Sequence, residues 1–493
     1  MIVPAQARLE DPGRDPATQV ARAKATRGAV PREAHAQFDP APDRPDPVRL
    51  LEDQARTRLA ELVPIRYGRM LASPLAYLRG AALAMAGDLA RTPDTGFIVQ
   101  ACGDAHLGNF GIFASPERRL VFDINDFDET LPAPWEWDVK RLATSLEIAG
   151  RVSGYGPKQR RRLVRETAAQ YRLEMRRLAG LGSLDVWYSR GELDELQARF
   201  RVVLTRRERM LAGTDLAAAG QEVHNLPAIV TAGVQDMSAR GRPPGSAQDM
   251  SAAGPGSRAA GSAQPRIKAA PPLIVPLTEL EPGGQDELGP QLDRIVTGYR
   301  ASLEPDRRYL MSQFMVADVA RKVSGIGSVG LPCWLVLLTG RDRGDYLFLQ
   351  LKEAQPSVLS QFAGATPFPS QGQRVVSGQR LMQAASDIFL GWHRSAERDY
   401  YVRQLRDWKF SIATAQMAPE TMRSYGALCG RTLARAHARS GDRVAIGAYL
   451  GSSPVFEAAI GEFAATYADQ NERDYERFRA AVKSGRLTAQ TGV

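Results

Sequence analysis

The sequence predicts an α+β protein with two lobes, a mostly helical large lobe and a small lobe built on an antiparallel sheet. Apolar residues recur at helical spacing through residues 48–89, 139–152 and 158–181. Residues 318–405 instead carry short apolar runs bounded by turns that contain Gly and Asp, which is typical of antiparallel strands. A stretch from about residue 235 to 265, rich in Gly, Pro, Ser and Ala, lies between the two patterns and is typical of a flexible linker.

These patterns divide the chain into five parts. Residues 1–47, rich in Pro, Asp, Arg and Ala without a period, indicate a disordered or loosely attached leader. Residues 48–234 form the first part of the large lobe, and residues 235–265 form the linker. Residues 266–405 form the small lobe, and residues 406–493 add C-terminal helices that complete the large lobe.

Length and composition fit a globular protein of this size. At 493 residues and 44% hydrophobic, the chain can bury one large or two moderate cores. Its three cysteines, Cys102, Cys333 and Cys429, are widely spaced and match neither a disulfide framework nor a zinc site. No apolar run has the length of a membrane span, and the N-terminus lacks a signal-peptide core. We therefore expect a cytoplasmic protein with no membrane partner.

Two polar motifs in the large lobe each follow a short apolar run. Gly103-Asp104-Ala105-His106-Leu107-Gly108-Asn109 follows residues 97–99, and Asp126-Phe127-Asp128 follows residues 119–122. In-line transfer of a phosphoryl group from ATP needs one carboxylate to orient the acceptor hydroxyl, and an Asn and a second carboxylate to hold magnesium. The motifs supply these groups in that order. They predict that Asp104 is catalytic, that Asn109 and Asp126 bind metal, and that Asp128 supports them.

The residues of the two motifs are also compatible with other interpretations. Asp, Asn and Gly are common in turns, so either motif alone could be an ordinary loop. The acidic cluster could bind calcium, but it lacks the central Gly and the distal Glu of an EF-hand loop. His106 is predicted to hydrogen-bond the loop and to fix its carboxylates, or to be a structural histidine.

The motifs resemble those of a known enzyme class. Gly103-Asp104-x-His106-x-x-Asn109, Asn125-Asp126-Phe127-Asp128 and Trp135-Glu136-Trp137-Asp138 are similar to the catalytic and metal-binding segments of aminoglycoside phosphotransferase-type kinases. Over most of its length the chain resembles a bacterial family known only as domain of unknown function 2252. The strings that carry this second resemblance are Pro64–Met70, Ala320–Val323, Gln379–Gln383 and Ala434–Asp442. The first resemblance implies a two-lobed protein-kinase-like fold.

Two further parts of a kinase site are found late in the chain. Gly325-Ile326-Gly327-Ser328-Val329-Gly330 lies between two extended segments, so the backbone N–H groups of Gly325, Gly327, Ser328 and Gly330 could bind phosphate. The strand over residues 346–352 ends at Lys352, our candidate for pairing with phosphate, although a solvated strand-end lysine is equally compatible. Leu405, after the last predicted strand, would line the nucleotide base.

The lysine strand also departs from the kinase pattern. Strand alternation places Gln350 and Lys352 on one face and directs Glu353 away from them. The next predicted helix, residues 375–386, contains no Glu to pair with the lysine. Because the small-lobe parts follow the large-lobe motifs, the order implies a circularly permuted kinase-like fold. Residues 74–90 or 422–438 could support the loop of Asp104, and chain continuity favours the first.

The positive charge of the chain is compatible with one other class of function, nucleic-acid binding. The net charge of +9 and the basic stretch at residues 158–177 are compatible with nucleic-acid binding, but recognised nucleic-acid motifs are lacking. The leading hypothesis is an ATP- and magnesium-dependent phosphotransferase acting on an unidentified hydroxyl, on a small molecule or a protein. The alternatives are nucleotidyl transfer, a nucleotide-binding regulator without turnover, and a basic nucleic-acid-binding module. The sequence indicates neither the acceptor nor an oligomeric state.

Overall fold

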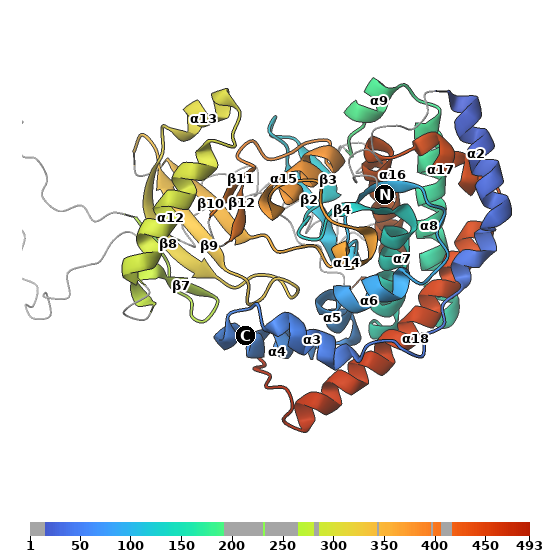
Figure 1. Cartoon of the computed structure of the whole chain (residues 1–493), viewed down its shortest axis with the longest axis horizontal. Coiled ribbons are helices and arrows are strands. Elements are labelled where there is room, and N and C mark those ends of the chain that lie inside the picture. Colours follow the sequence, from blue (N-terminus) through green and yellow to red (C-terminus); the bar gives the residue numbers. More distant parts are fainter. Residues whose placement is uncertain are drawn as a thin grey trace, which may run out of the picture.

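The small lobe contains an antiparallel sheet, as the sequence predicts. The computed structural model describes residues 15–191, 230–231, 265–280, 285–342, 345–395, 398–405 and 417–493. Within these residues the largest sheet has six strands in the order β11-β12-β10-β9-β8-β7 (Figure 1). The strands are β7 (Ile274–Pro276), β8 (Met315–Lys322), β9 (Cys333–Thr339), β10 (Tyr346–Glu353), β11 (Gly391–Arg394) and β12 (Asp399–Gln404).

Alternation along β10 decides which face of the sheet meets which neighbour. Leu347, Leu349 and Leu351 are buried against α12 (Gln285–Arg300) in one apolar cluster. Lys352 and Gln350 point to the opposite face, which turns toward the large lobe. The predicted helix after the lysine strand is α15 (Gln371–Met382), and the predicted final hairpin is β11 with β12. The short helices α13 (Pro305–Met311) and α14 (Ser360–Ala363) complete this part of the chain.

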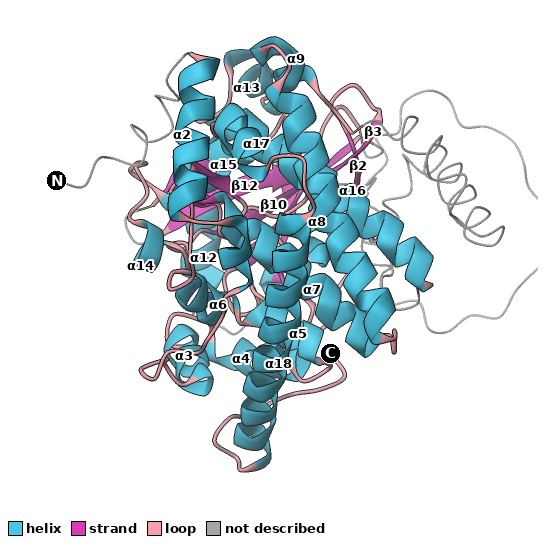
Figure 2. Cartoon of the chain, turned by 90° about the vertical axis from the view of Figure 1, so that its right-hand side faces the viewer, coloured by secondary structure: helices cyan, strands magenta, loops and turns pink. Residues whose placement is uncertain are grey.

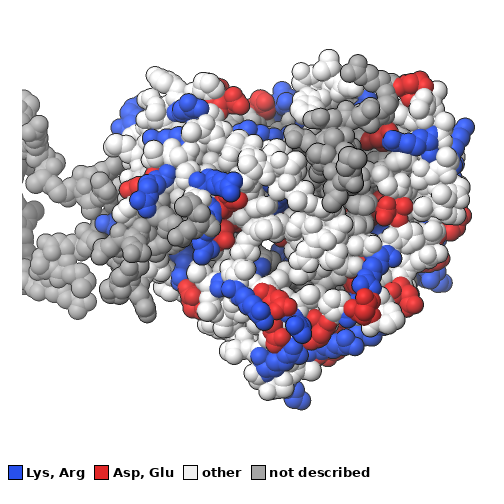
Figure 3. All heavy atoms as spheres, in the orientation of Figure 1, with Lys and Arg blue, Asp and Glu red and all other residues white. Residues whose placement is uncertain are grey.

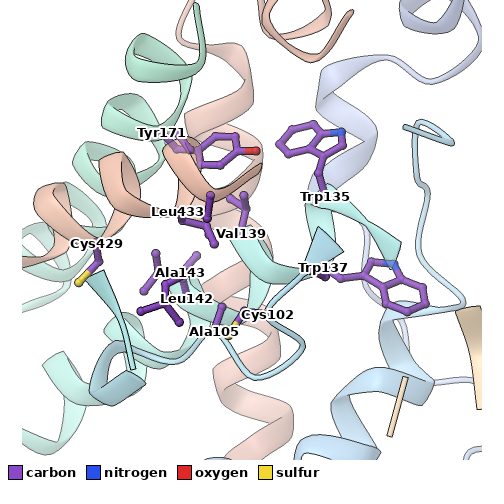
Figure 4. Close-up of a cluster of buried hydrophobic side chains, with 14 of the residues drawn as sticks. Cys102, Ala105, Trp135, Trp137, Val139, Leu142, Ala143, Tyr171, Cys429 and Leu433 are labelled. Atoms are coloured by element: carbon purple, nitrogen blue, oxygen red, sulfur yellow. The ribbon is translucent and has the colours of Figure 1, made fainter. Parts of the chain in front are cut away.

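The large lobe is mostly helical and packs around α7 (Trp135–Val152), α8 (Pro157–Ala179) and α16 (Pro419–Ser440). Figure 2 shows α7 and α8 beside α18, and α16 packs against α8. The Trp135 and Tyr171 rings stack with centroids 5.5 Å apart, and Figure 4 shows them beside the apolar side chains of α7. Among the described residues, this lobe also contains α3 (Pro47–Ala55), α4 (Val63–Met70), α5 (Pro74–Gly80), α6 (Ala82–Leu89), α9 (Ser183–Tyr188), α17 (Arg443–Leu450) and α18 (Val455–Lys483).

Two short sheets of two strands each carry the polar motifs. β1 (Ile98–Ala101) pairs with β4 (Leu131–Pro134), and β2 (Phe110–Ala114) pairs with β3 (Leu120–Ile124). Each candidate motif therefore follows a strand, as predicted. The single helix expected over residues 74–90 is instead two helices, α5 and α6, because the backbone of Ala81 leaves the helical conformation.

The prediction of a loosely attached leader is wrong for residues 15–47. Asp15 caps α2 (Pro16–Ala29), which packs against α17 with Ala23 fully buried. His35 is also fully buried and hydrogen-bonds the Tyr449 hydroxyl at 2.8 Å. The prediction relied on the low apolar content of this segment, but polar contacts of its arginines attach it to the rest of the protein. Arg32 donates to the Leu450 carbonyl, and Arg44 binds Asp88 and Asp474. Residues 1–14 lie outside the described part of the chain.

The predicted linker cannot be compared with the structure, because residues 235–264 lie outside the described residues. The described residues on either side, Val230–Thr231 (β5) and Arg266–Ile267 (β6), pair as antiparallel strands. Among the described helices, none alone combines the length and apolar character of a membrane span, although α17 and α18 do so together across an 89° bend.

Candidate functional site

A cavity of about 360 Å³ lies between the two lobes. Figure 3 shows the surface hollowed near the middle of this face, where the lobes of Figure 1 meet. The cavity is lined by nearly all the candidate site residues: Asp104, His106, Asn109, Asp126, Asp128, Gly325, Gly327, Ser328, Lys352 and Leu405. Gly330 is not among the lining residues. The fold thus gathers residues that are up to about 300 positions apart in the sequence around one space.

The loop that carries Asp104 is fixed by its backbone. Gly103 has a φ of +82°, and a Cβ atom there would lie 2.3 Å from the Glu129 carbonyl oxygen, so no other residue fits. The Asp138 carboxylate, in the first turn of α7, accepts hydrogen bonds from the N–H groups of Cys102 (2.6 Å) and Gly103 (2.9 Å). The Tyr425 hydroxyl of α16 donates to the Leu107 carbonyl at 2.7 Å. Figure 4 shows Cys102 and Ala105 resting near Leu142 and Ala143 of α7.

The Asp104 carboxylate has one oxygen occupied by an arginine. Arg141 of α7 donates to Oδ1 from Nε (2.9 Å) and Nη2 (2.6 Å). The His106 Nε2 atom lies 3.7 Å from the other oxygen, Oδ2. Burial lowers the pKa of His106 to about 4, so its imidazole is neutral near pH 7. Asp104 can therefore present Oδ2 to a ligand without a charged histidine beside it.

Asn109 joins the two motifs. Its Nδ2 atom donates to the backbone carbonyls of Asp126 (2.9 Å) and Asp104 (3.2 Å). These bonds fix the amide so that Nδ2 faces the loops. The motifs are separated in sequence but held as one unit.

Lys352 crosses from the small lobe to the second motif. Its Nζ atom lies 2.7 Å from Asp128 Oδ2 and 3.7 Å from Asp126 Oδ2. The Tyr401 hydroxyl of β12 donates to the other Asp128 oxygen. Lys352 is only 3% exposed; burial opposes its charge, but the two carboxylates outweigh burial and raise its pKa. This lysine is a buried, charged link between the lobes, and the alternative of a solvated lysine is excluded.

The glycine turn between β8 and β9 covers one side of the cavity. Gly325 has a φ of +70°, and its carbonyl accepts from Arg69 Nη1 at 2.6 Å. Gly330 faces away from the cavity: its carbonyl accepts from the Leu59 N–H at 2.8 Å, and a Cβ atom there would lie 2.9 Å from the Arg58 side chain. Gly330 thus ties the turn to the large lobe, while Gly325, Gly327 and Ser328 face the space.

The chain matches the model of a protein family. Residues 58–481 match the family described as an uncharacterized protein conserved in bacteria (DUF2252). The chain belongs to the DUF2252 family. No curated protein and no solved structure gives a significant match to it. The matched DUF2252 region begins at Arg58 and ends at Ala481, so it contains every residue of the cavity except Gln54 and Thr57.

Sequence reasoning about this DUF2252 protein missed several arginines. Arg141 lies one helical turn after Asp138, so helical spacing could have placed it beside the same loop. Arg374 of α15 donates to the backbone carbonyls of Asp128 (2.8 Å) and Thr130 (2.7 Å). Arg403 of β12 donates to Gln350 Oε1 and to the Asn125 carbonyl, both at 3.0 Å. No sequence signal predicts the contact of Arg374 with Asp128 or that of Arg403 with Asn125, because these pairs are 246 and 278 residues apart in the sequence.

The helix after the lysine strand behaves as its composition predicts. It brings Arg374 and no glutamate toward the second motif, and the partner of Lys352 is Asp128. Glu353 pairs with Arg398 at 2.6 Å, as strand alternation requires. The helix expected to support the Asp104 loop by chain continuity contributes less than α16, which hydrogen-bonds the loop directly through Tyr425.

The ligands available for magnesium are oxygens from two segments. Among the described residues, no three His, Cys, Asp or Glu side chains form a group able to hold a metal alone. Magnesium bound with a nucleotide commonly takes only one or two carboxylates from the protein, and phosphate and water complete its shell. Asp126, whose side chain is 41% exposed in the cavity, and the amide oxygen of Asn109 fit this limited role. Asp128 fits less well, because Lys352 and Tyr401 occupy its oxygens.

Proposed function

We propose that this DUF2252 protein is an ATP- and magnesium-dependent phosphotransferase with a kinase-like arrangement of two lobes. The observation that carries the proposal is the approach of Lys352 to Asp128 and Asp126, at 2.7 and 3.7 Å, across the cavity. A lysine on a strand of an antiparallel sheet (β10), a glycine turn between the two strands that precede it (β8 and β9), and a carboxylate motif in a helical lobe are the parts that phosphoryl transfer needs.

Each part has a role in the proposed reaction. The N–H groups of the turn at Gly325, Gly327 and Ser328 hold the phosphates, and Lys352 shifts from Asp128 to pair with them. Asn109 and Asp126 would hold magnesium, which would neutralise phosphate charge. Asp104 Oδ2 accepts a hydrogen bond from the acceptor hydroxyl, orients it, and takes its proton as the oxygen bonds to phosphorus. The bond from the acceptor oxygen to the γ-phosphorus forms as the bond to the β-phosphate oxygen breaks, which leaves ADP.

A permuted order of elements accounts for the position of the small lobe after the motifs. The last turn of α16 meets the strand that leads to Asp104, because the Ser440 hydroxyl accepts from the Gln100 N–H at 3.1 Å. A Cβ atom on Gly441 would lie 3.0 Å from the Ile98 carbonyl. The sheet, α16 and β1 therefore follow one another in space in the order sheet, helix, catalytic loop. This supports a circularly permuted kinase-like fold.

The proposal is tested by thermal unfolding with and without ATP and magnesium. A ligand at about 100 times its dissociation constant stabilises the folded state by about 2.7 kcal/mol. We expect a clear rise in melting temperature that is lost in Asp126→Ala and weakened in Lys352→Ala. Asp306→Ala, at an exposed position outside the cavity, serves as the control.

An unchanged melting temperature in the wild-type protein would contradict nucleotide binding. If ATP binds, incubation with candidate acceptors followed by mass spectrometry identifies the reaction. Phosphoryl transfer adds one phosphate to the acceptor, whereas nucleotidyl transfer adds AMP and releases diphosphate. Binding without any product would indicate a nucleotide-binding regulator.

A further inference from the structure

One cation in the cavity has no role in the reaction described above. Arg79, in the last turn of α5, lines the cavity. Among the described residues its guanidinium makes no hydrogen bond or ion pair, and its buried Nε atom has no partner. Most buried polar groups in proteins are paired, so an unpaired guanidinium at a cavity wall points to a ligand.

Arg79 stands where the two motifs and the glycine turn converge. Its Cζ atom lies 3.8 Å from the position of a Cβ atom on Gly108, one residue before Asn109. Its backbone carbonyl lies 3.5 Å from the corresponding position on Gly327, in the glycine turn. The nearby charges that favour its own charge are Asp104 and Asp126. The guanidinium is therefore close to the candidate acceptor-orienting and metal-binding carboxylates, and the backbone of Arg79 lies beside the glycine turn.

The neighbouring carboxylates do not need Arg79 as a partner. Asp104 is already paired with Arg141, and Asp126 Oδ2 lies 3.7 Å from Lys352 Nζ. Burial lowers the pKa of Arg79, so the protein holds this cation at a cost. A partly buried guanidinium whose Nε atom has no partner is prepared for an anion that arrives from outside.

We propose that Arg79 is a catalytic residue that binds the phosphoryl group during its transfer. This inference rests on the proposed phosphotransferase function. The transferred phosphoryl group carries negative charge on its three equatorial oxygens while one oxygen–phosphorus bond forms and the other breaks. Arg79 donates hydrogen bonds to those oxygens and exchanges no proton. It acts as an arginine supplied by the same chain to stabilise the charge of the transition state.

The test uses a mimic of the transferred group. Melting temperatures are measured with magnesium and ADP, and again after addition of aluminium fluoride, which takes the place of the phosphoryl group beside ADP. We expect aluminium fluoride to add a second rise in the wild-type protein. Arg79→Met, which keeps the aliphatic stem, is expected to keep the rise with ADP and to lose the second rise. Arg79→Lys is expected to retain part of it, and Arg56→Ala, at an exposed arginine, all of it.

The outcomes separate the two proposals. A wild-type protein that does not respond to magnesium and ADP would overturn the proposed function. A protein that responds to ADP but keeps its full second rise in Arg79→Met, or has none in the wild type, would overturn only the role of Arg79. If Arg79→Met does not fold, Arg79→Lys decides, because an undiminished second rise in that variant counts against a contact set by guanidinium geometry.

Discussion

At the scale of single residues, the carboxylate of Asp128 in the large lobe binds two side chains of the small lobe. Its oxygens accept from Lys352 Nζ and from the Tyr401 hydroxyl. Tyr401 is 1% exposed, so water cannot replace its hydroxyl. Tyr401→Phe is expected to lower the free energy of unfolding by about 1.5–3 kcal/mol, the usual worth of a hydrogen bond to a charged group. Urea unfolding measures the change.

The matched control for this prediction is Tyr309→Phe. Tyr309 is 73% exposed, and surface substitutions of this kind change stability by about 0.5 kcal/mol or less. Equal effects of the two substitutions would show that the Tyr401 hydroxyl contributes nothing across the lobes.

Glu129, next to Asp128, gives the site a pH dependence. Burial raises the pKa of Glu129 from 4.5 to about 7, although the Val358 N–H donates to its carboxylate at 2.7 Å. Between these pH values the folded protein keeps a proton that the unfolded chain has released. The stabilisation from this residue is therefore complete below pH 4.5 and is lost as the pH rises through 7.

Glu129→Gln should remove this dependence. As the pH rises from 5 to 8, we expect the free energy of unfolding of the wild-type protein to fall by about 2 kcal/mol relative to that of Glu129→Gln. This is less than the full pKa shift implies, because Glu129 is partly exposed and water screens its charge. Urea unfolding of both proteins at the two pH values measures this difference. Glu304→Gln, at an exposed position, controls for the loss of one carboxylate. A gap between wild type and Glu129→Gln that stays constant with pH would refute the shifted pKa.

The residues of the cavity differ in how far the sequence could reveal them. Asp104, Asn109 and Asp126 lie within short motifs whose residue types and spacing have a chemical meaning, so the sequence could bring them together. Lys352 was placed by strand alternation, which fixes the face of every side chain on β10. Arg79 and Arg403 could not be found in this way, because a single arginine on a helix or strand carries no signal of the cavity it enters.

At the scale of elements, helix α7 fixes the loop of the first motif, Gly103–Asn109, through hydrogen bonds. Asp138 in its first turn accepts from two backbone N–H groups of the loop and from His437 Nε2 at 3.1 Å. His437 is fully buried, and its other ring nitrogen bonds the Tyr171 hydroxyl at 2.8 Å. The loop thus depends on a buried polar chain that links α7, α8 and α16.

Asp138→Asn is expected to disturb this loop. The amide offers one acceptor oxygen where the carboxylate offers two, so at least one buried N–H group loses its partner, at a cost of about 1–3 kcal/mol. We expect lower stability in urea unfolding and a weaker rise in melting temperature with ATP and magnesium. Asp469→Asn, which alters a half-exposed ion pair with Arg151, is the control. An Asp138→Asn protein as stable as the wild type would remove α7 from this role.

The elements predicted best are those with a strict period. The strands around the glycines, the lysine strand and helices α7 and α8 appear within a few residues of their predicted bounds. Helix α12 was missed because Pro290 lies inside it and Gly and Pro precede it. Helix α2 was missed because ion pairs and caps, which composition does not reveal, hold it to α17.

At the scale of the whole molecule, the distribution of charge bears on the nucleic-acid alternative. Figure 3 shows Lys and Arg interspersed with Asp and Glu on this face, with both signs together over α3 and α18. Part of the positive charge is used internally, since Arg44, Arg172 and Arg374 are largely buried on carboxylates or carbonyls. A net charge of +9 therefore reflects structural arginines as well as surface charge.

The two lobes should respond together to a nucleotide, because the groups proposed to bind it come from both. The glycine turn and Lys352 belong to the small lobe, and the motifs at Asp104 and Asp126 belong to the large lobe. We expect magnesium and ADP to slow amide hydrogen exchange in residues 323–331 and also in residues 102–110, as measured by mass spectrometry of peptides. Exchange in α17, which lies away from the cavity, should not change, and Asp126→Ala should abolish the effect in both segments. Protection confined to one lobe would mean that the nucleotide does not bridge the cavity, because a ligand can slow exchange only in segments whose opening it opposes.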